Sequence, residues 1–286
     1  MYSTLSVHFL PTLTTPEEMA AGVVVMVDVL RASTTITTAL AAGASGVYPC
    51  AEIDEACRHA ADMGRHGQAT AKALVAAAAE MTGASVRSSS PPLRGATAEP
   101  LLGGERGGLP IEGFDLGNSP SEYTPDRVAG RTIVFTTTNG TQALTICNVA
   151  QRVLIGSFVN FSAVIDHLNG ELPIHVLCAG TRGRITREDV LMAGAVVERI
   201  AGPIVEQSAL NDEARIARDV WKNAMGELRP PHRRANQRLA EVLRDCQGGR
   251  NLIKVGLERD IEAAADFDRY DFVPHYDLHT GMIVKL

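Results

Sequence analysis

The clearest structural signal in the chain is the segment at residues 23–35, VVVMVDVLRASTT. Its first half is almost continuously apolar, which is typical of a central strand covered on both faces of a sheet. The polar residues from Arg31 onward then form a turn, and small residues up to about Ala42 predict a helix that Gly43 ends. The segment therefore predicts one strand–turn–helix unit of an α/β protein.

The same order of strand, polar turn and helix recurs twice further along the chain. A strand at 132–135 precedes a turn at 136–141 and a helix at 142–149, and a strand at 174–178 precedes a turn at 179–184. Strands that alternate with helices indicate an α/β fold, which we expect to have three α/β/α layers around a mixed, largely parallel sheet. Further elements are expected at 47–49 and 153–155 (strands), 52–63 and from 186 (helices), 206–245 (two helices) and 271–286 (a last edge strand).

Composition limits the classes of function. The 286 residues are 45% hydrophobic, which is enough to bury a substantial core. The 27 basic and 33 acidic side chains give a net charge of −6, which disfavours non-specific binding to nucleic acid. Apolar runs are too short to span a membrane, and no basic residue precedes Arg31, so we expect no signal peptide. Five cysteines without a CxxC pair predict reduced thiols and a cytoplasmic protein.

Two segments interrupt the pattern. Residues 66–98 combine an alanine-rich stretch with a serine–proline cluster, so we expect a flexible insertion in a single domain that spans residues 1–286. Residues 102–118 are rich in glycine but also carry Glu105, Arg106 and Asp115. Long glycine loops inside a compact domain often serve function, and the embedded charges favour that interpretation.

The turn after the first strand has the residues of an anion site. Burial of Asp28 at a strand end is unfavourable unless the carboxylate has a partner, and Arg31, Ser33 and Thr34 surround the start of the next helix. In the simpler alternative, Asp28 pairs with Arg31 and a hydroxyl group caps the helix.

The turn at 136–141 offers a second group of polar residues at a helix start. Its members are Thr138, Asn139, Gly140 and Thr141, and an ordinary helix cap is again the simpler alternative. Because open α/β sheets bind ligands at the carboxyl ends of their strands, the two turns together predict a ligand the size of phosphate or sulfonate.

Familiar catalytic signatures are incomplete in this chain. Cys178 and Arg184 have the Cys-x5-Arg spacing of thiol phosphatases, but the usual preceding histidine and following hydroxyl residue are absent. Arg65-His66-Gly67 follows a helix rather than the strand that a histidine phosphatase needs. The glycines at 103–108 lack the flanking strand and helix of a dinucleotide site. The eight histidines show no metal-ligand spacing, which disfavours zinc.

Several motifs, in order along most of the chain, resemble those of the 2-phosphosulfolactate phosphatase family. They are residues 28–35, 104–108, 113–120 (GFDLGNSP), 136–141, 178–180, 188–189 and 193–194. The resemblance implies a three-layer α/β/α fold and a magnesium-dependent phosphatase that converts 2-phospho-3-sulfolactate to 3-sulfolactate and phosphate, a step toward coenzyme M. The segment at 66–98 departs from the family pattern. This departure bears on how the substrate reaches the site and not on the core chemistry.

Residue chemistry agrees with this resemblance. Magnesium prefers hard oxygen ligands, and Asp28, Glu105 and Asp115 are the candidates for both metal binding and catalysis. The anionic substrate needs cations and hydrogen-bond donors, for which the candidates are Arg31, Ser33, Thr34, Arg106, Asn118, Ser119, Thr138, Asn139, Gly140 and Thr141.

Several alternatives remain open at this point. The Asp-x-Asp signature of haloacid-dehalogenase phosphatases is absent because Leu30 occupies its second position, so we favour attack by water over a phosphorylated Asp28. The substrate could instead be another small phosphorylated hydroxy acid, or the protein could bind anionic metabolites without catalysis. A homo-oligomer is possible, and neither nucleic acid nor a membrane is an expected partner.

Overall fold

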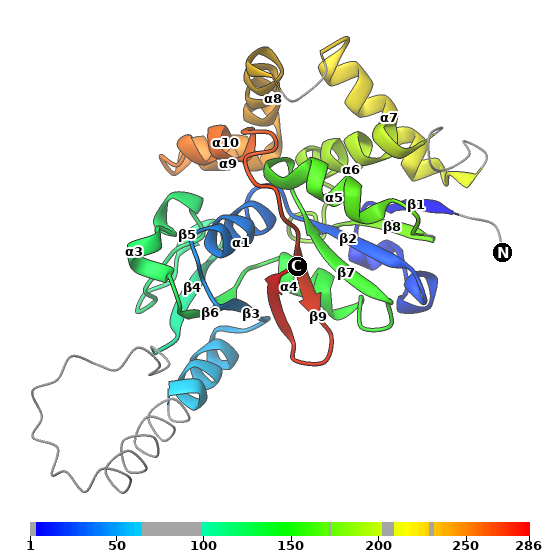
Figure 1. Ribbon diagram of the computed structural model, residues 1–286. Coiled ribbons are helices and arrows are strands. Elements are labelled where there is room, and N and C mark those ends of the chain that lie inside the picture. The colour runs from blue at the N-terminus through cyan, green and yellow to red at the C-terminus, as the bar shows by residue number, and fades with distance from the viewer. Residues whose placement is uncertain (1–3, 65–98, 172, 202–208, 229–231) are drawn as a thin grey trace, which may run out of the picture.

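The computed structural model describes residues 4–64, 99–171, 173–201, 209–228 and 232–286. Strands of this described part form one ten-stranded sheet, in the order β1-β8-β2-β7-β9-β10-β3-β6-β4-β5 (Figure 1). The strands are β1 (Leu5–His8), β2 (Val23–Val27), β3 (Gly46–Cys50), β4 (Leu101–Arg106), β5 (Leu109–Pro110), β6 (Thr132–Thr136), β7 (Arg152–Gly156), β8 (Ile174–Cys178), β9 (Pro274–Asp277) and β10 (Met282–Lys285).

The sheet has two parallel halves joined by an antiparallel hairpin. Strands β1, β8, β2 and β7 are parallel neighbours, and so are β3, β6 and β4. The hairpin of β9 and β10 lies between the halves, where β9 pairs with β7 and β10 pairs with β3. The sequence predicted one edge strand at 271–286, and this prediction is wrong. The segment forms two strands, and both lie inside the sheet, because β9 pairs with β7, β10 pairs with β3 and Ile283 is fully buried.

Helices cover both faces of the sheet, which confirms the three-layer α/β/α architecture. Alternate residues of β2 show the division: Val23, Val25 and Val27 pack under α5 to α8, whereas Val24 and Met26 pack under α1 and α4. The α-helices are α1 (Ala32–Ala41), an unlabelled helix at 53–64, α3 (Pro125–Val128), α4 (Gly140–Thr145), α5 (Phe161–Leu168), α6 (Arg187–Ile200), α7 (Asp212–Met225), α8 (Arg233–Asp245), α9 (Gln247–Lys254) and α10 (Arg259–Ala264).

Short 3-10 helices complete the described elements. They are η1 (Pro11–Leu13), η2 (Pro16–Met19), η3 (Pro120–Glu122) and η4 (Phe158–Asn160). None of the helices in the described part of the chain is long and apolar enough to cross a membrane. The segment expected to be a flexible insertion, 66–98, lies outside the described residues.

The glycine-rich stretch at 102–118 was expected to be a loop, but its first residues form β4. Gly104 makes this strand possible, because its φ of +132° is rare for other residues and an added Cβ would collide with the backbone of Thr136 on β6. The glycines therefore allow close approach of two strands rather than a loop. Their position places Glu105 near the carboxyl end of β4, next to the end of β6.

Candidate functional site

A cleft of about 830 Å³ opens at the carboxyl ends of the parallel strands. Its wall is made by the segments that follow β2, β4, β6 and β8, together with α9 from the C-terminal part of the chain. This is the edge at which α/β sheets bind ligands, and it is the edge expected from the sequence. Six of the residues expected in the site line the cleft: Asp28, Arg31, Glu105, Asn118, Thr138 and Asn139.

Buried carboxylates form the deep part of the site. Asp28 lines the cleft at the end of β2, and its Oδ1 accepts a hydrogen bond of 3.3 Å from the Ala32 amide. Behind it, Asp189 accepts from the amides of Val29 (2.9 Å) and Gly180 (3.0 Å), which fixes the turns after β2 and β8. Glu188 beside it accepts from the Gly248 amide through Oε1, while its buried Oε2 has no hydrogen-bond partner.

Burial, with the charges of neighbouring carboxylates, raises the pKa of several of these carboxyl groups. Burial and the neighbouring charges of Asp189, Glu105 and Glu188 hold the pKa of Asp28 well above its usual range. Burial, with the charge of Asp189, raises the pKa of Glu188 to about 7, and burial raises the pKa of Asp189 to about 6. So much negative charge in a buried place is unfavourable, and a cation bound in the cleft would relieve it.

Glu105 connects two loops of the cleft. Its Oε1 accepts hydrogen bonds from the amide and the hydroxyl group of Thr138, both at 2.9 Å, and its Oε2 accepts from the Gly108 amide at 2.5 Å. A buried carboxylate with three donors is held in one orientation. Glu105 thus joins the turn after β4 to the turn after β6, and both turns lie on the wall of the cleft.

Arg31 is held in the wall by a partner from the far end of the chain. Its Nη1 pairs with Oδ2 of Asp260 on α10 at 2.8 Å, and its Nη2 donates to the Gly108 carbonyl at 3.1 Å. Asp260 also accepts from the Ser119 hydroxyl at 2.6 Å. Arg31 and Asp260 are both buried, so the guanidinium group is fixed at the cleft rather than mobile. The Asp28–Arg31 pair of the simpler alternative is replaced by this pair with Asp260.

Several hydroxyl groups expected to bind substrate form hydrogen bonds with backbone groups instead. Ser33 accepts from the Asp28 amide, and Thr34 donates to the Val29 carbonyl, both at 2.8 Å. Thr141 donates to the Thr137 carbonyl. These side chains, like Ser119, are absent from the lining of the cleft, so they stabilise the turns that carry the lining residues.

Two charged residues of the glycine-rich stretch point elsewhere. Arg106 donates to the Ala51 carbonyl (2.6 Å) and to Thr136 Oγ1 (2.8 Å), and it does not line the cleft. Asp115 is exposed and accepts from the Leu102 amide at 2.8 Å. The structure thus brings Asp28 and Glu105 to one cleft, but it places Asp115 outside it.

Sequence reasoning missed several residues that the fold brings to the site. They are Glu188, Asp189, Asp260 and three further cations on the cleft wall, Arg182, Arg184 and Lys254. Glu188 and Asp189 were recognised as part of a family motif but were not assigned to the site, although both are almost fully buried in α6. The sequence signal that could have identified them is the pair of adjacent acidic residues after the third strand–turn unit.

The incomplete thiol signature has no support in the geometry. Cys178 is fully buried in the apolar core under α6, and burial holds the pKa of its thiol well above the usual range. A nucleophilic cysteine needs an accessible thiolate, which this side chain lacks. The Arg65-His66-Gly67 motif lies outside the described residues.

The residues of the cleft fit a magnesium ion. Asn118 lines the cleft with a buried Oδ1 that has no hydrogen-bond partner, and Gly140 keeps space free beside Asp28, where an added Cβ would lie 3.2 Å from Oδ2. Among the described residues, the cleft carboxylates do not form a group of three with ligand atoms within 4.8 Å of one another. Magnesium needs only one or two carboxylates, because water and substrate oxygens complete its octahedron.

Comparisons with known proteins agree on one family. The family model described as 2-phosphosulpholactate phosphatase matches the chain at residues 9–89 and 71–279. A probable 2-phosphosulfolactate phosphatase of Symbiobacterium thermophilum is 36% identical over 94% of this chain and 97% of its own length. Proteins of the same name from Thermotoga petrophila (34%, 87% of both chains) and Clostridium perfringens strain 13 (31%, 90% of this chain and 87% of that one) are also similar. The chain therefore belongs to the 2-phosphosulfolactate phosphatase family, a family of phosphoric monoester hydrolases.

Proposed function

We propose that this protein hydrolyses 2-phospho-3-sulfolactate to 3-sulfolactate and phosphate, and that the reaction requires Mg²⁺. The observation that carries the proposal is the composition of the cleft, where Asp28 and Glu105 lie on the same wall as Arg31, Arg182 and Arg184. A site for a phosphate monoester with a metal ion needs both kinds of charge, whereas a site that only binds anions has no use for buried carboxylates. The relatives named as phosphatases of this substrate support it further.

The cations suit a substrate with several negative groups. The substrate carries a phosphate, a sulfonate and a carboxylate on a three-carbon skeleton. Arg31, fixed on the cleft wall by Asp260 and the Gly108 carbonyl, has further N–H groups that would donate to one such group. Arg182, Arg184 and Lys254 lie on more exposed parts of the wall, where they would bind the groups that do not react.

The oxygen atoms of Asp28 and Asn118 are the ones that would hold the metal ion. Asp28 Oδ2 faces the space beside Gly140, and Asn118 Oδ1 is buried without a partner. When bound there, Mg²⁺ supplies charge neutralisation of the phosphoryl oxygens and orientation of the attacking water. Glu105 fixes the two turns around the reacting group, so we assign it a positioning role.

Charge balance explains why the carboxylates are tolerated. In the absence of a cation, burial and the nearby charges of Asp189, Glu105 and Glu188 raise the pKa of Asp28. A divalent cation favours the ionised form of such groups, since it attracts the carboxylate more strongly than neighbouring carboxylates repel it. We propose further that the reaction takes place in the cytoplasm and is a step toward coenzyme M.

A phosphate-release assay with the purified full-length protein tests the proposal. We expect turnover of 2-phospho-3-sulfolactate with Mg²⁺ and none with excess chelator, with recovery when Mg²⁺ is restored. The same assay with 2-phospholactate, which lacks the sulfonate, should give a kcat/KM lower by at least about tenfold. Equal rates for both compounds would contradict the substrate, and full activity in excess chelator would contradict the metal requirement.

A further inference from the structure

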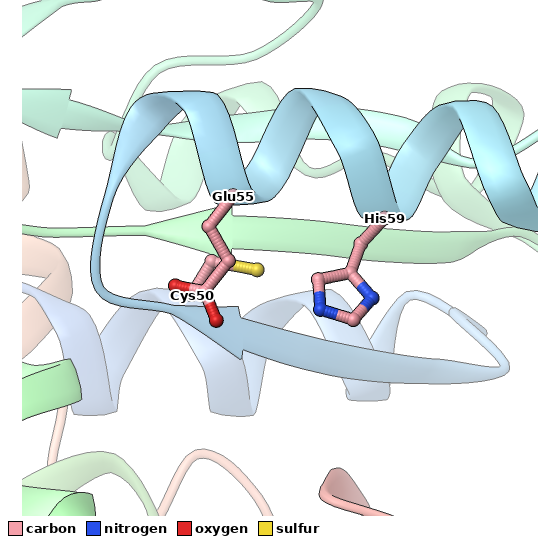
Figure 2. Close-up of side chains that lie close together, drawn as sticks. All are labelled: Cys50, Glu55 and His59. Carbon is pink, nitrogen blue, oxygen red and sulfur yellow. The ribbon is translucent and has the colours of Figure 1, made fainter.

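A second group of metal-ligating side chains lies away from the cleft. It consists of Cys50 at the end of β3 and of Glu55 and His59 on the helix at 53–64 (Figure 2). One ligand atom from each residue (sulfur, oxygen and nitrogen) lies within 4.8 Å of the other two, and no other group in the described part of the chain meets this criterion. None of the three residues lines the cleft.

We propose that Cys50, Glu55 and His59 form a zinc site that fastens the helix at 53–64 to the end of β3. Thiolate, imidazole and carboxylate are the ligands that zinc takes in proteins, and three protein ligands with a water complete a tetrahedron. Zinc bonds of about 2.0–2.3 Å in a tetrahedron place ligand atoms roughly 3.4–3.8 Å apart. The present separations of up to 4.8 Å close to that range by small side-chain rotations.

The spacing on the helix directs two ligands to the same place. Glu55 and His59 are four residues apart, so their side chains leave the same face of the helix, and Figure 2 shows both directed toward the β3 strand that carries Cys50. The sequence offered no paired histidines or cysteines, which is why zinc was not expected from it. The third ligand comes from the strand, and only the turn at 51–52 brings it under the helix.

Neighbouring contacts hold these ligands in position before a metal binds. Glu55 Oε2 accepts hydrogen bonds from the amides of Ala51 at 2.9 Å and Glu52 at 3.4 Å, which orient the carboxylate. The His59 ring packs on Tyr48, with ring centroids 4.5 Å apart. Cys50 is almost fully buried, whereas Glu55 and His59 are half-buried, so the three residues form a corner, here called the Cys50 corner, between the interior and the surface.

Titration of the metal-free full-length protein with Co²⁺ tests the proposal, with excess Mg²⁺ present to occupy the cleft. A tetrahedral site with a thiolate gives Co²⁺ an intense sulfur-to-metal charge-transfer band, which a site of oxygen ligands does not. We expect one equivalent of Co²⁺ to produce this band and one equivalent of Zn²⁺ to remove it. Bound Zn²⁺ should also raise the Tm of the protein, since it binds the folded chain.

Variants assign the band to the three residues. Cys57 provides a matched control, because it is an exposed thiol on the same helix outside the group. Cys57→Ser should keep the band and the Zn²⁺-dependent rise in Tm. His59→Gln, which replaces a half-buried side chain and should leave the fold intact, should weaken Co²⁺ binding at least tenfold, and Cys50→Ser should abolish the band. Absence of the band in the unmodified protein, its loss in Cys57→Ser, or unchanged binding in His59→Gln would each overturn the proposal.

Discussion

The cleft and the Cys50 corner are two candidate cation sites that the fold builds in opposite ways. The cleft offers oxygen ligands from Asp28 and Asn118, which lie far apart in the sequence. The Cys50 corner collects sulfur, nitrogen and oxygen from the ten residues at 50–59. Ligand hardness then separates the ions that each can hold: magnesium for the cleft, and zinc for the corner.

The two sites also differ in how their polar atoms are satisfied. In the cleft, Glu188 Oε2 and Asn118 Oδ1 are buried without partners, and like charges raise the carboxyl pKa values. In the corner, Glu55 already accepts bonds from the helix start and His59 packs on Tyr48. Buried polar atoms without hydrogen-bond partners are typical of functional sites, so we assign catalysis to the cleft and structural support to the corner. The following experiments test whether this division holds.

The largest difference in turnover is expected between the variants Asp28→Asn and Cys50→Ser. The first removes the charge that would hold the metal ion, with almost no change of shape, so turnover should fall by roughly a hundredfold or more and the Mg²⁺ requirement should rise. The second should change turnover by less than about twofold, because Cys50 does not line the cleft. Rates measured against both substrate and Mg²⁺ give the answer. Near-normal turnover of Asp28→Asn at ordinary Mg²⁺ would leave Asp28 with a structural role only.

A second test uses the pH dependence of stability in the absence of divalent cations. Because the pKa of Glu188 is raised to about 7 in the folded protein, its contribution to stability is complete below about pH 4.5 and is lost as the pH rises through 7. Glu188→Gln removes this titration. The free energy of unfolding of the variant, relative to that of the unmodified protein, should therefore rise by roughly 3 kcal/mol between pH 4.5 and 8.

Comparison of the two proteins at each pH cancels the other titrating groups. One of these groups is His175, whose pKa is lowered to about 4 by burial and by the charge of His8. Its contribution to the stability of the folded protein is lost as the pH falls below about 6.5. Addition of Mg²⁺ should raise Tm more at pH 8 than at pH 5, since the carboxylates are then free of protons. Parallel pH profiles for Glu188→Gln and the unmodified protein would contradict the assignment.

Arg31→Lys separates substrate binding from metal binding. Lysine keeps the charge but cannot contact Asp260 and Gly108 at once, so the cation is no longer fixed at the cleft. We expect KM to rise about tenfold, with a smaller fall in kcat and no change in the Mg²⁺ requirement. Arg152→Lys, which alters a partly exposed pair with Glu171 outside the cleft, is the matched control. An increased Mg²⁺ requirement in Arg31→Lys would show that the two functions are not separate.

The smallest effect on turnover is expected for Cys178→Ser. The side chain lies in the core, so turnover should stay within about twofold, while a buried hydroxyl group should lower the free energy of unfolding by about 1 kcal/mol. Phosphate release and thermal unfolding measure the two effects. Loss of activity in a folded Cys178→Ser variant would restore the thiol mechanism that the burial of this residue argues against.

Local patterns of the sequence predicted the repeated units but not how they meet. The strand at 23–27, the helix after Arg31 and the roles of Asp28 and Arg31 as cleft residues follow from apolar runs and turn residues close in sequence. By contrast, the pairing of Arg31 with Asp260 spans 229 positions, and no local pattern carries it. Asp115 shares its motif with cleft residues yet points away, because side-chain direction depends on the pairing of β4 with its neighbours.

The C-terminal hairpin has a consequence for the order in which the protein becomes active. Strands β9 and β10, at Pro274–Asp277 and Met282–Lys285, come after the other described strands in chain order, yet they join the half-sheet that carries Asp28 to the half-sheet that carries Glu105. A nascent chain that has not yet exposed residues 274–285 therefore lacks the link between the two halves of its sheet. Loss of residues 274–285 should leave an inactive protein in which the edges of β7 and β3 are exposed, and such edges favour aggregation.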